Sequence, residues 1–305
     1  MENSNFDPGL TQQYGDKLRR VIRKDGEFNV RRQGGTWRDI HPYVFLMNQP
    51  WPIFLGEIFA GFVTANLLFA VVYYAIGIDS LRGAEAPTAI GRFLNAFFFS
   101  SQTFTTVGYG TIVPLSATAN LLASFEAMVG LMSFAVATGF LVGRVTRPSA
   151  RIGFSDTMLV APYHGGTSLQ FRIVNRSVSN LMELEARMLL MTVEKVGERL
   201  ERKYAGLALE RDRVLFMPLT WTIVHPIDSQ SPLNGMTAAA LAQMQAEVLI
   251  LVKGVDDSFS QTVHARYSYR FDEIVWNARF APAFDVDADG DLRLELNKVS
   301  KLAAG

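Results

Sequence analysis

The chain has 305 residues, of which 49% are hydrophobic, and its 29 Lys and Arg residues balance 29 Asp and Glu residues. A net charge of zero gives no support for a nucleic-acid partner. The sequence has no cysteine, which excludes disulfides and thiolate metal sites. Apolar residues are concentrated in the first half, so the chain is expected to combine a membrane part with a soluble part.

The N-terminal residues 1–36 are polar and contain no apolar run suited to a signal peptide. Their positive charge favours a cytoplasmic N-terminus, because Lys and Arg flank membrane spans mainly on that side. The next segment, 39–47, is short, amphipathic and aromatic, with Pro42 near its start, where a helix tolerates proline. It predicts a helix lying along the membrane surface within residues 39–50. The alternative is that this segment is only the first turn of the following helix.

Two long apolar stretches predict transmembrane helices. Residues 53–76 contain one charge, Glu57, and at about 1.5 Å per residue they can cross a hydrocarbon core of about 30 Å. Trp51 before this span, and Tyr73 and Tyr74 at its end, are expected at the membrane interfaces. The second span, 120–142, has Glu126 as its only charge. Its glycines are either packing contacts or bending points, and the sequence leaves both open: Gly130, Gly139 and the following Gly143.

A pore loop is predicted between the two spans. Residues 93–103 are aromatic and too short to cross the membrane, but long enough to enter it halfway. Residues 105–110, which follow after one residue, read TTVGYG. Irregular backbone at this depth is tolerated only inside protein or beside a water-filled path. We therefore predict a reentrant helix, whose negative dipole end favours cations, followed by an ion filter.

The filter prediction depends on backbone geometry. Glycine can adopt φ values closed to other residues, so that successive carbonyls point to one side. Those carbonyls and the Thr106 hydroxyl can replace the water around K+, as in potassium channels generally. K+ is thus the expected permeant ion, with no cofactor. The predicted filter residues are Thr106, Val107, Gly108, Tyr109 and Gly110. An isolated Gly-Tyr-Gly is more often an ordinary turn, but the flanking spans favour the filter.

Beyond residue 148 the hydrophobic period changes from 3.6 to 2, which predicts an antiparallel β-sandwich over 149–305, of the immunoglobulin-like kind. One clear helix is expected at 237–245. The strand candidates are 169–173, 185–193, 213–219, 248–252, 273–276 and 292–296. The expected organisation is a cytoplasmic N-terminal segment (1–38), an interfacial helix (39–50), a transmembrane pore domain (51–148) and a cytoplasmic sandwich (149–305).

Several short motifs besides TTVGYG resemble those of the inward-rectifier potassium channels, especially the prokaryotic KirBac group. They are Arg147-Pro148 after the second span, the H-x-I-D-x-x-S-P-L string at 225–233, Ala265-Arg266 and the EIVW string at 273–276. The resemblance implies a homotetramer whose filters share the fourfold axis and whose sandwiches form a cytoplasmic vestibule. It also implies passive K+ conduction without catalysis, and a bacterial inner membrane location with both termini cytoplasmic.

The resemblance also suggests roles for individual residues. Phe134 stands where strongly rectifying members carry an acidic residue, so weak rectification is expected. Val142 matches the position where the inner helices cross, and implies a gate that closes by dewetting. Gln102 and Ile112 replace a Glu and an Arg that pair across the filter in many members. How this filter is braced is therefore open.

Anionic lipids, including phosphoinositides, are expected partners. Basic residues at the membrane surface are each worth about 1 kcal/mol of attraction to anionic lipid. The candidates are Arg38, Trp51, Arg144, Arg147 and Arg151, which lie where the family meets lipid headgroups. The alternative is that these charges only set topology. In the sandwich, the loop 254–261 resembles one that narrows the vestibule, and its Asp256 and Asp257 either concentrate cations or form a solvated turn.

Other sequence patterns give weaker evidence for function. Asp285, Asp287, Asp289 and Gly290 imitate the start of a calcium loop, but the twelfth position is Leu296 instead of Glu, so a hairpin turn is favoured. His225 and Asp228 have no nucleophile implied nearby and are expected to be structural. A potassium symporter would need several pore loops in one chain. A nucleotide-gated channel lacks support because no G-x-G-x-x-G follows a strand, and the pore loop argues against a receptor.

Overall fold

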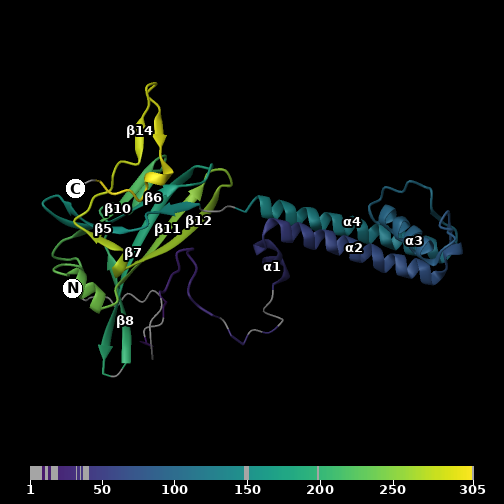
Figure 1. Ribbon diagram of the computed structural model, residues 1–305, viewed down its shortest axis with the longest axis horizontal. Coiled ribbons are helices and arrows are strands. Elements are labelled where there is room, and N and C mark those ends of the chain that lie inside the picture. Colours follow the sequence, from purple (N-terminus) through teal and green to yellow (C-terminus); the bar gives the residue numbers. More distant parts are fainter. Residues whose placement is uncertain are drawn as a thin grey trace. The chain divides into compact units, whose positions relative to one another are not determined.

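The computed structural model describes residues 9–10, 13–14, 20–31, 33–34, 36, 41–147, 151–197 and 199–303. The chain divides into two compact units. The helical unit is Arg32–Arg147, and the β unit joins Met1–Arg31 to Pro148–Gly305 (Figure 1).

Three helices of the helical unit lie near the predicted positions. They are α2 (Trp51–Ile76), α3 (Ala89–Phe104) and α4 (Ala117–Val145). The first and last are long and apolar enough, by length and composition, to cross a membrane. All three begin before their predicted starts, and α3 and α4 also end later than predicted. The side chains of Thr88 and Ser116 accept the backbone N–H groups of Gly91 and Ala119, which starts α3 and α4.

A separate short helix, α1 (Pro42–Asn48), precedes α2. It lies within the predicted interfacial segment. The alternative, that this segment is the first turn of α2, is wrong: Gln49 and Pro50 have ψ values of 152° and 149°, which interrupt the helix. The cause is Pro50, because a residue before proline disfavours the helical region. Proline is then tolerated at the start of α2.

Figure 1 shows α3 beside α2 and α4 at one end of the helical unit. Aromatic and small side chains fill the space between these helices; the buried members are Ala70, Tyr73, Ile78, Leu81, Ala84, Ala96, Phe99 and Ala119. Tyr73 is fully buried, so its predicted interface position is wrong, whereas Tyr74 is exposed. The short helix η2 (Ile78–Ser80) and the strands β2 (Leu81–Arg82) and β3 (Val113–Pro114) complete this end.

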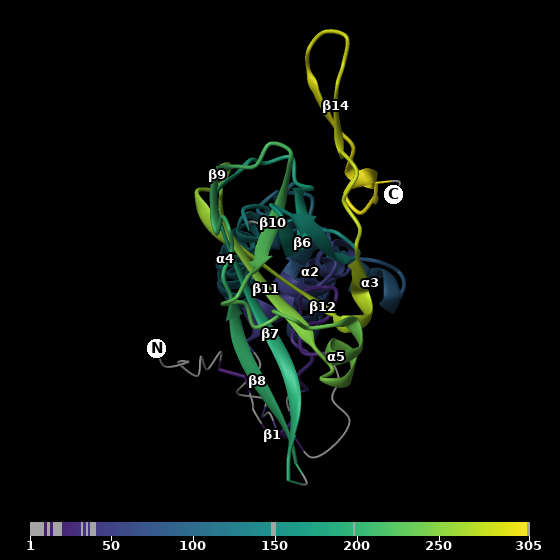
Figure 2. The same cartoon turned by 90° about the vertical axis from the view of Figure 1, so that its left-hand side faces the viewer.

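The β unit is a sandwich, as predicted. Its six-stranded sheet runs β1 (Gln13–Tyr14), β8 (Arg199–Leu207), β7 (Leu181–Val196), β11 (Glu247–Asp256) and β12 (Gln261–Arg270), with β9 (Arg213–Phe216) paired to β7. Its five-stranded sheet runs β10 (Thr220–Ile227), β6 (Gly166–Asn175), β5 (Met158–Tyr163) and β13 (Ile274–Trp276), with β4 (Ile152–Phe154) paired to β6. The paired β7 and β8 extend past the end of β11 (Figure 2).

One core joins the two sheets. Leu169, Phe171 and Ile173 of β6 point inward, as their alternation predicted, and meet Ile250 of β11 and Tyr269 of β12. The sandwich is not wholly antiparallel, because β13 pairs with β5 in parallel. The predicted strand 273–276 begins one residue late, after the short helix η3 (Phe271–Glu273). The predicted helix appears as α5 (Ala238–Gln243).

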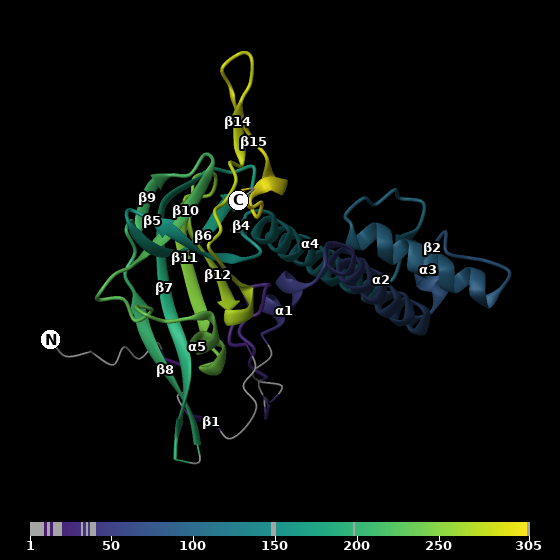
Figure 3. The same ribbon diagram turned by 60° about the vertical axis from the view of Figure 1, so that its left-hand side comes forward.

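The acidic segment near the C-terminus is a hairpin, as favoured above. Strands β14 (Phe284–Val286) and β15 (Leu292–Leu294) pair antiparallel and project from the sandwich (Figure 3). Asp287 holds the turn, since its Oδ1 accepts the N–H groups of Asp289 and Asp291, both at 3.0 Å. The predicted strand ends early, because Leu296 lies in the short helix η4 (Leu296–Lys298).

Residues 20–30 pack against the six-stranded sheet. The single backbone N–H of Val21 is shared between the two carboxylate oxygens of buried Glu247, at 3.1 and 3.0 Å. Arg20 forms an ion pair of 2.6 Å with Glu273. Val21 and Ile22 also join a small apolar cluster with Met191. The segment that leads toward the helical unit is therefore fixed to the β unit.

Candidate functional site

The predicted filter follows directly from the end of α3. Positive φ values occur at Thr106 (59°), Gly108 (53°) and Gly110 (77°), and not at Val107 or Tyr109. In extended backbone successive carbonyls point to opposite sides, but an alternating sign of φ turns them toward the same side. Thr106 carries strain, because a β-branched residue rarely adopts positive φ. The backbone is thus shaped to present a row of carbonyls.

The N–H groups of the filter are bonded back to α3. Val107 and Gly108 both donate to the Gln102 carbonyl, at 2.9 and 3.2 Å, and Thr106 donates to that of Thr103 at 3.0 Å. Within the part of the chain that the structure describes, no donor is hydrogen-bonded to the carbonyls of residues 106–109. Val107 and Tyr109 are 53% and 75% exposed. Free carbonyls on an open edge can coordinate a desolvated cation.

The outer end of the filter is tied to the loop before α3. Strand β2 pairs with β3, and Leu115 donates its N–H to Ser80 at 2.8 Å. Gly83 lies so close to this end that a Cβ atom there would meet the Thr111 carbonyl oxygen at 2.2 Å. This contact accounts for one glycine of the outer loop that the sequence did not explain.

Behind α3, four polar side chains are fully buried: Asn66 and Tyr73 of α2, Ser100 of α3 and Glu126 of α4. Tyr73 donates to Glu126 at 2.7 Å, and Ser100 contacts both Glu126 and Asn66. Sequence reasoning noted Glu126 only as a lone charge and placed Tyr73 at the interface. The available signal was a carboxylate and a hydroxyl inside two apolar spans, which normally face a partner.

The predicted pore-lining residues are both on α4. Phe134 is 74% exposed and Val142 is 55% exposed in the single chain. They are eight positions apart, about two helical turns. Both side chains are exposed in the single chain, so they are open to contact with a neighbouring copy or a pore.

Two of the predicted lipid-binding residues contact each other. The Arg144 guanidinium lies 4.7 Å from the ring centres of both Trp51 and Phe54. It donates to the Leu46 carbonyl at 3.1 Å and also to the Gln49 carbonyl. Arg144 is thus half-buried and fastens the C-terminal end of α1 to the end of α4. The net attraction combines hydrogen bonds at a helix C-terminus with cation–π contact.

The other basic candidates are more open. Arg147 is exposed and donates to the Asn48 side chain at 2.7 Å. Arg151 is exposed at the start of the described β unit. Arg38 lies outside the described residues. The structure therefore brings Trp51, Arg144 and Arg147 to one end of the helical unit.

In the β unit, the buried His225 is hydrogen-bonded through both ring nitrogens to other residues of the same unit. Its Nδ1 lies 2.6 Å from the Ala208 carbonyl and its Nε2 lies 2.7 Å from the Ser231 hydroxyl. A carbonyl can only accept, so Nδ1 carries the proton and Nε2 accepts from Ser231. Burial lowers the pKa of His225, which favours this neutral form. The histidine holds the turn that follows β10 and, as expected, has a structural use.

The loop after β11 is also held internally. The carboxylate of Asp256 is 2% exposed and accepts hydrogen bonds from the Ser179 hydroxyl at 2.7 Å and the Ser258 N–H at 2.9 Å. It is a buried turn cap and is not open to cations. Asp257 is exposed. Of the two interpretations offered for this pair, the turn fits Asp256.

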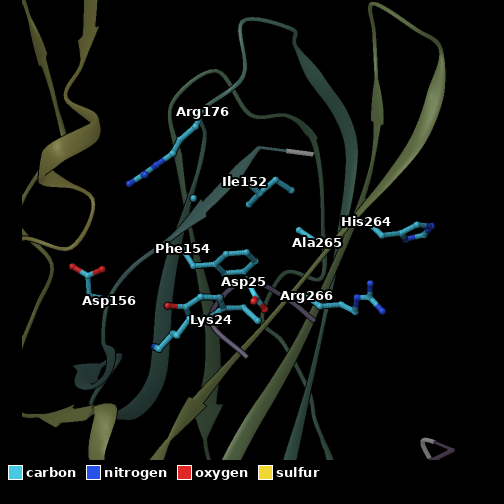
Figure 4. A pocket seen from close by; sticks show the side chains of 12 residues that line it. Lys24, Asp25, Ile152, Phe154, Asp156, Arg176, His264, Ala265 and Arg266 are labelled. Atoms are coloured by element: carbon cyan, nitrogen blue, oxygen red, sulfur yellow. The ribbon is translucent and has the colours of Figure 1, made fainter. Parts of the chain in front are cut away.

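A cavity of about 370 Å³ lies where the N-terminal segment meets β4 and β12 (Figure 4). Its lining mixes Lys and Arg with Asp, and Lys24 is already paired with Glu273 at 2.8 Å. The cavity therefore lacks the concentration of one charge that an ion site needs. In the described ranges, no group of three or more His, Cys, Asp or Glu side chains could hold a metal ion.

Comparisons with known proteins agree with this geometry. Residues 152–304 match the family model described as the inward rectifier potassium channel C-terminal domain, and residues 61–147 match the one described as ion channel. The chain is 36% identical over 288 residues to the inward rectifier potassium channel Kirbac3.1 of Paramagnetospirillum magnetotacticum, covering 93% of this chain and 96% of that protein.

More distant relatives are similar over nearly the same range. The G protein-activated inward rectifier potassium channel 2 of Mus musculus is 25% identical over 304 residues, covering 92% of this chain and 71% of that protein. The G protein-activated inward rectifier potassium channel 3 of Mus musculus is 26% identical over 310 residues, covering 94% of this chain and 78% of that protein. The similarity spans both units.

Proposed function

The chain belongs to the inward-rectifier potassium channel family and is a membrane protein with K+ as its permeant ion, and from this premise we propose how its residues conduct and control that ion. The filter is Thr106 to Gly110, with K+ bound by the carbonyls of Thr106, Val107, Gly108 and Tyr109. The observation that carries the assignment is the alternation of φ along these residues, since it turns a row of unbonded carbonyls to one side.

The functional assembly is a homotetramer. One filter strand presents carbonyls from one direction only, whereas a desolvated cation needs oxygen ligands on all sides. Filter side chains in the single chain are exposed, and so are large apolar residues on α4 such as Leu121, Phe125 and Leu131. Copies around an axis would close the ion site, while neighbouring helices and lipid cover the apolar faces.

The gate is on α4. Val142 would form a ring of apolar side chains that closes the pore by dewetting. Phe134 offers no negative charge to attract a blocking cation, so rectification is weak. Both proposals follow from the exposure of these side chains and from the family position.

Anionic lipids are the proposed regulators. The exposed Arg147 and Arg151 are the primary contacts, because their charges are available to headgroups at about 1 kcal/mol each. Arg38 joins them on its family position alone. Arg144 and Trp51 act by holding α1 against the end of α4, so that lipid binding beside them is felt by the helix that carries the gate. No cofactor is required.

The proposed location is the cell membrane, that of a bacterial inner membrane, with both termini in the cytoplasm. The chain is then organised as a cytoplasmic N-terminal segment to residue 38, an interfacial helix within 39–50, a pore domain to residue 148 and a cytoplasmic sandwich from residue 149. Basic residues that follow α4 support this orientation.

The test is cation uptake by liposomes that contain the purified protein. We expect uptake of Rb+, a K+ substitute, to exceed that of Na+ and to be blocked by Ba2+. Gly108→Ala should abolish uptake, because its φ of 53° is unfavourable for alanine. Gly61→Ala is the matched control, since a Cβ atom at Gly61 of α2 would meet nothing within 4 Å. Equal uptake of Na+ and Rb+ by the wild type would refute selectivity.

A further inference from the structure

With Glu126 ionised, the buried polar cluster behind α3 would have three acceptor oxygens facing two hydroxyl protons. The acceptors would be both carboxylate oxygens of Glu126 and Asn66 Oδ1, and the donors Ser100 and Tyr73. Ser100 Oγ lies 3.1 Å from Asn66 Oδ1 and in hydrogen-bond contact with Glu126 Oε1. A hydroxyl has one proton and can donate to only one of these two oxygens. The remaining contact needs a proton from its other partner.

The orientation of Asn66 decides which partner supplies it. Its Nδ2 donates to the Phe62 carbonyl at 2.7 Å. Turning the amide over would place two oxygens at that distance, so Oδ1 faces Ser100. Ser100 therefore donates to Asn66, and Glu126 donates to Ser100. Tyr73 supplies the last proton, to Glu126 Oε2 at 2.7 Å. Every group is satisfied when the carboxyl is neutral, as a fully buried carboxyl without a cationic partner prefers.

A second contact lies one turn farther along the same two helices. Glu126 and Gly130 are four apart on α4, and Ser100 and Phe104 are four apart on α3, so each pair shares a face. A Cβ atom at Gly130 would meet the Phe104 carbonyl oxygen at 2.0 Å. The backbone of α4 thus touches the last residue of α3, directly before Thr105 and the filter.

We propose that neutral Glu126 is the positioning residue of the filter, an inference that depends on the filter assignment above. Through Ser100 and Tyr73 it joins α2, α3 and α4 in one hydrogen-bonded cluster, and the Gly130 contact sets how closely α4 approaches the end of α3. This cluster holds α3, and hence the carbonyl row, in place of the side-chain pair absent at Gln102 and Ile112. Glu126 acts through α3 and does not touch the ion.

The test compares Glu126→Gln with Glu126→Leu. A glutamine amide can donate to Ser100 while its oxygen accepts from Tyr73, so Rb+ over Na+ selectivity should stay at the wild-type level. Leucine can do neither and leaves Ser100 and Tyr73 with unmade hydrogen bonds. We expect selectivity to fall by about tenfold, with the tetramer intact in detergent. If glutamine lowers selectivity as leucine does, the carboxyl is ionised and the proposal is wrong.

Ser100→Ala keeps the test decisive should the leucine variant fail to assemble. It removes the hydrogen bond from Glu126 to α3 and should also reduce selectivity. The matched control is Ser124→Ala, because the exposed Ser124 donates to the Asn120 carbonyl of its own helix, at 2.9 Å, and not to α3 within the described residues. Unchanged selectivity in assembled Ser100→Ala overturns the positioning role. Wild-type protein is measured in parallel, and its failure to select would refute the filter assignment instead.

Discussion

Replacing Gly130 by alanine should disturb the filter from the opposite side of α3. The added Cβ atom would lie 2.0 Å from the Phe104 carbonyl oxygen and 2.8 Å from its carbon, both backbone atoms. Relief to an ordinary contact distance of 3.4 Å requires a shift of about 1.4 Å between the two helices. Overpacking of this kind costs about 1–3 kcal/mol, against which the better helix propensity of alanine returns up to about 1 kcal/mol.

The expected results are a lower midpoint of thermal unfolding and reduced Rb+ uptake in liposomes. Gly61→Ala provides the control, because it makes the same change on a membrane helix with open space around the added atom. It should be neutral or slightly stabilising. Equal unfolding midpoints and equal uptake for the two variants would show that α4 does not press on the end of α3, and the reasoning would fail.

Three further outcomes follow from contacts elsewhere. Arg144→Ala should speed amide hydrogen exchange in α1, because the end of that helix loses two hydrogen bonds to its carbonyls. Arg147→Ala, at an exposed position, should mainly weaken the response of Rb+ uptake to anionic lipid. The reverse pattern would contradict the assigned roles. Burial raises the pKa of Glu273, but hydrogen bonds from Arg20 and Lys24 outweigh burial and hold that pKa below the usual range. The contribution of Glu273 to the free energy of unfolding should therefore be lost as pH falls through the lowered pKa. Thermal melts of Glu273→Gln in acid should lack this pH dependence. Burial lowers the pKa of His225, so stability should also decline below about pH 6.5, where the unfolded chain binds the proton first; melts of His225→Gln that keep the same slope would refute this.

Elements with a strong local signal were predictable. Two apolar runs gave α2 and α4, because a helix must satisfy its own backbone in lipid and needs about 20 apolar residues to cross it. Alternation identified β6, since side chains on a half-buried strand point to opposite faces. The ends of helices were missed where the capping residue, such as Thr88, stood several positions before the continuous apolar run from which the helix was predicted.

Features that depend on distant partners were not predictable. The parallel pairing of β13 with β5 depends on where the chain returns after more than a hundred residues, and Leu296 follows the strand pattern although β15 has already ended. Tyr73 has the amphipathic side chain typical of membrane interfaces, but in the fold its hydroxyl is hydrogen-bonded to the buried Glu126. For Gly130 the sequence left open whether the glycine is a packing contact or a bending point, and only the position of Phe104 in the fold favours a packing contact.

The sequence by itself determined that the chain has a membrane part with a filter and a β-rich part, because length, hydrophobic period and the φ freedom of glycine are local properties. The tertiary structure alone decided which groups meet behind α3. There Glu126 and Gly130 of α4 contact Ser100 and Phe104 of α3. Hydrogen bonds and close contacts act over a few ångströms of space, and neither spacing nor composition can bring residues from separate helices together.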